Sequence, residues 1–197
     1  MRVQDKLPTH ITVGRRRYRI NTDFRRVLRM TEIMDDRGLT DEARDWLALR
    51  CVMRFPPRSR ERQVEALKAL RDLFFPVTCK TGDGKKITDL GQDAELIVAA
   101  FWQTYKVNLW RDRLTWFEFS ALLGGIPEGS RYADVLGIRA RPMPKPTKWN
   151  AEEREWLMKA KAVHALTMTE QEQADNYSRS VKALFDGLLS MAGDKHG

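Results

Sequence analysis

Apolar residues recur at three- and four-residue steps through most of this 197-residue chain, which places them on one face of a helix. The pattern is clear in Phe24, Val27, Leu28, Thr31 and Met34, where charged residues take the other face. Five further segments show the same spacing, beginning near residues 40, 59, 88, 115 and 130. The sequence therefore predicts a mainly α fold.

Residues near the start of each apolar stripe are of the types that favour the first turn of a helix. Side chains of Ser, Thr and Asp accept the unpaired N–H groups of a first helical turn. The expected caps or first residues are Thr22 or Asp23, Thr40 or Asp41, Ser59, Thr88 or Asp89, Leu114 or Thr115, and Ser130. Before them, residues 10–13 and 17–20 flank Gly14-Arg15 and predict a small β-hairpin. Residues 77–79 and 85–87 are predicted to form two further short strands around a turn at 81–84.

The large apolar side chains of these stripes are expected to form the core. We expect its centre at Phe101, Tyr105, Trp116 and Phe119. The other side chains predicted to face inward are Trp46, Leu49, Met53, Val64, Leu67, Leu70, Phe74, Leu90, Ala94, Ile97, Val98 and Trp102. The stripe from residue 90 to 105 is so wide that burial on more than one side is expected.

Residues 140–149 contain three alternating prolines, which predict an extended linker. The predicted organisation is a helical body at 1–139, the linker at 140–149 and a C-terminal helical pair at 150–197. Asn150 with Glu153, and Thr169 with Glu172, fit the capping-box spacing at the two helix starts. In the second helix a heptad seam is formed by Tyr177, Val181, Leu184, Leu188 and Met191. This seam either docks on the chain's own body or is offered to another chain.

The cysteines, the apolar runs and the titratable residues indicate the cellular compartment and whether a catalytic or metal site is expected. The two cysteines, Cys51 and Cys79, lack CxxC spacing and predict reduced thiols in an intracellular protein. No apolar run has signal-peptide or membrane-span length. The three histidines share no helix face, and no nucleophile–base pair or acidic metal cluster is evident. We therefore expect a soluble, non-enzymatic protein without a metal or cofactor.

Two polar segments have structural explanations that we prefer to catalytic ones. Asp89, Asp93 and Glu95 cluster at a predicted helix start, where the helix dipole favours negative charge. The Gly-containing segment 81–84 precedes two lysines but lacks the spacing of a phosphate-binding loop.

Charge is unevenly distributed along the chain. The net charge is +8, with +10 on residues 1–149 and −2 on residues 150–197. Basic runs occur at residues 15–17 and at Arg58, Arg60 and Arg62, and such runs suit an acidic partner or a nucleic acid. The aromatic residues fall on apolar stripes and not between the arginines. We therefore do not expect nucleic-acid binding.

The central block carries a family resemblance. It reads DAELIVAAFWQTYKVNL from Asp93 to Leu109, then LTWFEFSALLGGIP from Leu114 to Pro127, with a basic dipeptide at Ile138-Arg139. This pattern resembles the bacteriophage "gene product fifteen" family, over roughly residues 7–141 but not 150–197. Asn108, Thr115 and Phe117 depart from the family pattern, in which Asp, His and Trp are usual.

The resemblance implies a tail assembly protein, acting as a chaperone of the helical tape-measure protein in the bacterial host cytoplasm. Its expected partners are the tape-measure protein and other tail assembly proteins, with self-association. The expected partner-binding residues are Trp102, Tyr105, Trp110, Trp116, Tyr177, Val181, Leu184, Leu188 and Met191. The alternative is a basic nucleic-acid-binding accessory protein of a phage or prophage.

Overall fold

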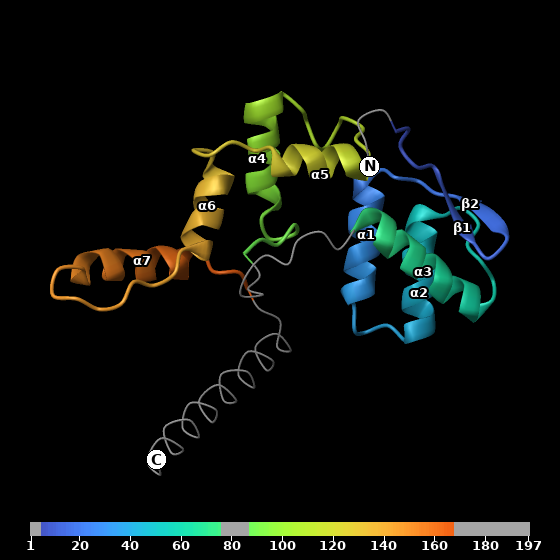
Figure 1. Cartoon of the computed structure of the whole chain (residues 1–197), viewed down its shortest axis with the longest axis horizontal. Coiled ribbons are helices and arrows are strands. Elements are labelled where there is room, and N and C mark those ends of the chain that lie inside the picture. The colour runs from blue at the N-terminus through green and yellow to red at the C-terminus, as the bar shows by residue number, and fades with distance from the viewer. Residues whose placement is uncertain (1–4, 76–86, 168–197) are drawn as a thin grey trace, which may run out of the picture. The chain divides into compact units, whose positions relative to one another are not determined.

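The computed structural model describes residues 5–75 and 87–167, and its described elements are seven helices and one β-hairpin (Figure 1). The elements are β1 (His10–Val13), β2 (Arg16–Arg19), α1 (Phe24–Asp35), α2 (Asp41–Val52), α3 (Arg60–Phe74), α4 (Ala94–Tyr105), α5 (Trp116–Gly124), α6 (Arg131–Ala140) and α7 (Ala151–Val163). The predicted mainly α fold with an N-terminal hairpin is confirmed.

The chain forms two compact units, and each draws on two separate stretches of sequence. The first unit comprises residues 1–86 and 94–134, and the second comprises residues 87–93 and 135–197. The proline segment 140–149 belongs to the second unit. The turn predicted at 81–84 and the strands predicted beside it at 77–79 and 85–87, apart from Ile87, lie outside the described residues. So do Cys79, the Thr169 cap and the seam predicted at Tyr177–Met191.

The hairpin of the first unit is antiparallel, with His10 opposite Arg19 and Val13 opposite Arg16. Gly14 begins its two-residue turn at φ +58°, a conformation that glycine adopts at little steric cost. The backbone N–H of Gly14 donates to Glu65 Oε1 of α3 at 2.8 Å. The hairpin therefore packs through β1 on α3, with Ile11 and Val13 buried.

Helices α1, α2 and α3 lie side by side in the first unit, and α1 also packs on α5 (Figure 1). Asp23 caps α1 by accepting the N–H of Arg25, and Thr40 caps α2 by accepting that of Ala43. Thr115 forms a complete capping box with Glu118 at the start of α5. These local caps confirm three of the predicted helix starts.

Backbone hydrogen bonds join the start of α1 to the start of α5, about ninety residues later in the chain. Phe24 N donates to Leu114 O at 3.1 Å, and Trp116 N donates to Thr22 O at 2.6 Å. Arg25 strengthens this junction, because its Nη2 donates to the carbonyl oxygens of Leu109 and Asp112, both at 2.7 Å. This charged side chain therefore fixes the loop that precedes α5.

The core of the first unit is an aromatic stack. The ring of Phe119 lies 4.7 Å from that of Phe24 and 5.4 Å from that of Phe101, nearly parallel to both. Trp116 is buried beside them, and its indole Nε1 donates to Phe74 O at 2.8 Å. The predicted centre of the core is confirmed for these residues, whereas Tyr105 is half-buried and donates to Leu122 O.

Four sequence predictions about α2, α3 and α4 are wrong. Trp46, Val64 and Trp102 were expected to face inward but are 39%, 38% and 53% exposed. Ala66 and Gln63 take the buried side of α3, which rotates Val64 away from the core. Helix α4 begins at Ala94 and not near residue 88, because residues 90–93 form a separate turn.

The second unit is held together by side chains that bind the backbone of its irregular segments. Asn150 accepts the N–H of Thr147 and donates to Lys145 O, both at 2.8 Å. It makes no side-chain cap on α7, so the predicted capping box with Glu153 is wrong, and Glu153 instead pairs with Arg141. Arg154 of α7 also donates to Pro144 O. The proline segment is therefore bound to α7.

Candidate functional site

The aromatic residues expected to bind a partner do not form one surface. Trp102 and Trp110 are exposed, at 53% and 75%, and both belong to the first unit. Trp116, in contrast, is 7% exposed and lies in the core, and the hydroxyl of Tyr105 is bonded within the unit. Of the described aromatic residues expected to bind a partner, Trp102 and Trp110 are therefore the ones that a partner can reach.

An apolar groove on the first unit is a stronger candidate for a binding site. We define the apolar groove by its lining side chains from α1, α2, α3 and the C-cap of α3. They are Met30, Thr31, Met34, Asp35, Asp45, Val64, Leu67, Lys68, Arg71 and Phe75. The groove has a volume of about 490 Å³. Val64 is exposed because its side chain lines this groove and does not enter the core.

The rim of the apolar groove carries both signs of charge. Asp35 lies on α1 and Lys68 on α3. Asp45 of the rim is paired with Arg60 at 2.5 Å. Two methionines line the apolar part, and unbranched methionine side chains adapt to differently shaped apolar partners. The groove can therefore take an apolar ligand segment that has charged residues along its flanks.

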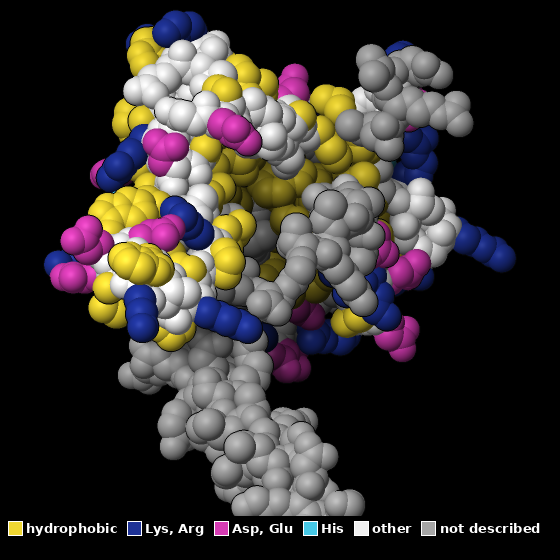
Figure 2. Space-filling model, turned by 60° about the vertical axis from the view of Figure 1, so that its left-hand side comes forward, with side chains coloured by type: hydrophobic (Ala, Val, Ile, Leu, Met, Phe, Trp, Pro, Cys, Tyr) yellow, Lys and Arg dark blue, Asp and Glu magenta, His cyan; other side chains and the backbone are white. Residues whose placement is uncertain are grey.

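The second unit also exposes apolar side chains, on α7 and just before it. Trp149 is 94% exposed, Trp156 54%, Met158 60% and Val163 77%. Figure 2, in which the left-hand side of Figure 1 comes forward, shows hydrophobic side chains at the surface between charged ones. None of these four side chains lines the apolar groove of the first unit.

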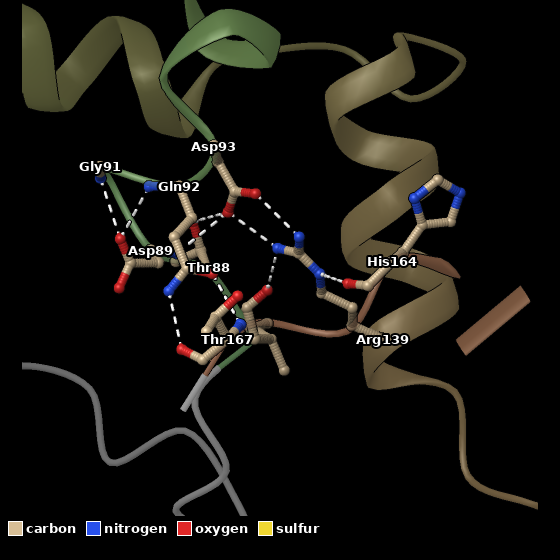
Figure 3. A network of polar contacts seen from close by, with 9 residues as sticks. Thr88, Asp89, Gly91, Gln92, Asp93, Arg139, His164 and Thr167 are labelled. Carbon is tan, nitrogen blue, oxygen red and sulfur yellow. Dashed lines mark hydrogen bonds and ion pairs between the residues drawn. The ribbon is translucent and has the colours of Figure 1, made fainter. Parts of the chain in front are cut away.

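A network of polar contacts, here called the polar clasp, joins residues 88–93, Arg139, His164 and Thr167 within the second unit (Figure 3). The guanidinium of Arg139 binds both carboxylate oxygens of Asp93 at 2.8 Å. It also donates to His164 O at 2.6 Å and to Ile87 O at 3.1 Å. Gln92 and Thr167 exchange two further hydrogen bonds.

The Asp93 carboxylate is almost fully enclosed, since its side chain is 2% exposed and that of Arg139 is 11% exposed. It also accepts the backbone N–H of Asp89 at 2.9 Å and the hydroxyl of Thr88 at 3.3 Å. Asp89 in turn accepts the N–H groups of Gly91 and Gln92, which caps the turn before α4. The cap expected at residue 88 or 89 is thus present, but it closes a single turn.

Acidification should weaken the second unit through Asp93. Burial alone would raise the pKa of this carboxyl, but hydrogen bonds from Arg139, Asp89 and Thr88 and the charge of Arg139 lower it below its usual value. A lowered folded-state pKa stabilises the fold fully above the unfolded-state pKa, about 3.9, and this stabilisation is lost as pH falls through the folded-state value. We expect amides of residues 87–93 and α7 to lose protection in that window, measured as exchange relative to the intrinsic rate at each pH.

The control for this acid effect is Asp93→Asn, which removes the titrating group. Its second unit should be less stable near neutral pH and should respond less to acid. Equal acid responses of the two proteins would contradict the assignment of the effect to Asp93.

Metal-binding clusters and membrane-spanning helices are both absent from the part of the chain that the structure describes. Among residues 5–75 and 87–167, no three His, Cys, Asp or Glu side chains are grouped so that they could share a metal ion. None of the helices in that part of the chain has the length and apolar character required to cross a membrane. Cys51 is half-buried, and burial raises the pKa of its thiol against the opposing effect of Arg29 and Arg26.

The structure is that of a small helical protein with an N-terminal hairpin. Its ion pair between Asp93 and Arg139 joins the two ends of the central block that carries the family resemblance. The family model described as "Bacteriophage Gp15 protein" matches residues 3–166. The chain therefore belongs to the bacteriophage Gp15 protein family. No curated protein and no solved structure matches the chain.

The family match extends further than the resemblance indicated. It continues past residue 141 through α7 and includes every member of the polar clasp except Thr167. Asp93 and Arg139, at the two ends of the recognised block, form the buried ion pair of the second unit. Among the departures from the family pattern, Thr115 caps α5 and Asn108 accepts the N–H of Trp110. Both residues therefore have structural roles in this chain.

Proposed function

We propose that this phage protein is a non-enzymatic tail assembly protein that binds the tape-measure protein as a chaperone in the host cytoplasm. The apolar groove supports the proposal best. A tape-measure helix presents apolar stripes that would aggregate if left uncovered, and an amphipathic helix fits a groove through residues spaced at i, i+3, i+4 and i+7. The opposite charges of Asp35 and Lys68 on the rim can orient such a helix.

The proposal includes self-association, because many copies would act along one tape-measure protein. Residues 177–191 supply the candidate contact between copies. The exposed Trp102 and Trp110 are a second face that the partner could use. Loss of capture by Trp110→Asp without loss by a groove variant would place the partner there.

Capture of a co-expressed tape-measure fragment should be lost in Val64→Asp. Val64 is 38% exposed in the apolar groove, so an added carboxylate would be desolvated by the bound helix without disturbing the core. Pull-down of the unaltered protein should be similar at about 50 and 500 mM salt, because apolar contact is not screened.

Leu47→Asp is the matched control. Leu47 is 41% exposed on α2 and does not line the apolar groove. Its variant should capture the fragment as the unaltered protein does. If Val64→Asp also retained full capture, the groove would not be the binding site.

A further inference from the structure

A second groove on the first unit has a different character. We define the basic groove by its lining residues from β2, the segment that follows it and the C-terminal end of α2. They are Arg16, Arg17, Tyr18, Arg19, Ile20, Asn21, Thr22, Val52, Arg54 and Phe55. Its volume is about 920 Å³. Four arginines and no carboxylate contribute to this lining, so the groove attracts anions.

The four arginines of the basic groove are available for a ligand. In the described part of the chain, none of them forms an ion pair with a carboxylate, whereas Arg60 and Arg71 do. Arg50 adds a further positive charge at one end, since its guanidinium donates to the carbonyl oxygen of Arg54 at 2.7 Å. Guanidinium groups suit phosphate because they donate paired hydrogen bonds in a fixed plane.

Aromatic side chains lie among these arginines. Phe55 is 74% exposed, and the guanidinium of Arg54 lies 5.3 Å from the centre of its ring. Tyr18, which is half-buried, also lines the groove. The chain brings Phe55 beside β2 because Asn21 N donates to Val52 O at 2.7 Å. The sequence argument against nucleic acid assumed that aromatics and arginines were separate, and this premise does not hold here.

We propose that the basic groove binds single-stranded nucleic acid. Arg17 and Arg19 share the face of β2 opposite to that of the buried Ile11 and Val13, and together with Arg54 they would neutralise phosphates, while bases would stack on the exposed face of Phe55. Arginines combined with accessible aromatic rings are the means by which proteins bind single strands without sequence preference. An acidic peptide would use the same arginines but would gain little from the ring. Dependence on Phe55 therefore separates these two partners.

Fluorescence anisotropy of the full chain with a labelled oligothymidylate of about 20 nucleotides tests the proposal. Neutralising three phosphates of a single strand should give a slope of log affinity against log salt of about −2.1, and Arg17→Ala should reduce its magnitude by about 0.7. Phe55→Ala should weaken binding roughly fivefold to a hundredfold, the loss expected for one stacked base.

The matched controls are Arg62→Ala and Trp110→Ala, which alter an exposed arginine and an exposed tryptophan outside the basic groove. Neither should change binding by more than about twofold, a fraction of the contribution of one stacked base. Circular dichroism of Phe55→Ala should be unaltered, because this ring is exposed. Tighter binding of a polyglutamate peptide than of the oligonucleotide would overturn the proposal. So would equal binding by Phe55→Ala and Trp110→Ala.

Discussion

Replacing Arg139 by methionine should destabilise the second unit by about 3–5 kcal/mol, because it leaves a buried carboxylate without its charged partner. Three structural groups lose their donor together, namely the Asp93 carboxylate and the carbonyl oxygens of Ile87 and His164. Amides of residues 87–93 and α7 should then exchange with solvent roughly a hundredfold to several thousandfold faster, if exchange follows the opening equilibrium.

Arg141→Met is the matched control, because Arg141 lies close by and also forms an ion pair. Its partner is Glu153 at 2.5 Å, but the two side chains are 51% and 47% exposed. Exposed pairs contribute about 0–1 kcal/mol, so this variant should remain close to the unaltered protein. Similar losses in the two variants would mean that enclosure of the Asp93–Arg139 pair has little effect on stability.

Replacing Phe119 by alanine should destabilise the first unit by about 3–5 kcal/mol, which is the usual cost of truncating a buried aromatic ring. This ring stacks between Phe24 and Phe101, so its loss leaves a cavity at the place where α1, α4 and α5 meet. Denaturant unfolding followed by tryptophan fluorescence should show the change, since Trp116 lies beside the stack with ring centres 5.8 Å apart.

Trp110→Ala is the control, because it also truncates an aromatic side chain to alanine but at a site that is 75% exposed. It should change the free energy of unfolding by less than about 1 kcal/mol, as surface substitutions usually do. If Phe119→Ala unfolded at the same denaturant concentration as Trp110→Ala, the aromatic stack would not be the centre of the core.

Local chemistry made much of this fold predictable from the sequence. The helix starts at Asp23, Thr40 and Thr115 depend on side chains that bond to backbone groups two or three residues away. The hairpin turn likewise begins at Gly14, whose φ of +58° glycine adopts at little steric cost. Such short-range features are visible in the sequence because their partners are neighbours in the chain.

The candidate sites were less predictable, because long-range neighbours determine them. Spacing identified Val64 as apolar, but it could not show that Ala66 and Gln63 would occupy the buried side of α3. Asp93 was interpreted as a helix-start carboxylate, whereas it pairs with a residue 46 positions later. Phe55 could not be placed beside the arginines of β2 without the hydrogen bond between Asn21 and Val52.

The junction between the starts of α1 and α5 has a consequence for vectorial synthesis on the ribosome. Phe24 emerges early, but its stacking partner Phe119 is 95 positions further along the chain. At translation rates of about 5–20 residues per second, roughly 5–20 s separate the synthesis of the two rings. During that interval the nascent α1 presents its aromatic face without its final cover. Host factors that bind nascent apolar segments would therefore find their target in residues 24–34 until Phe119 has been synthesised.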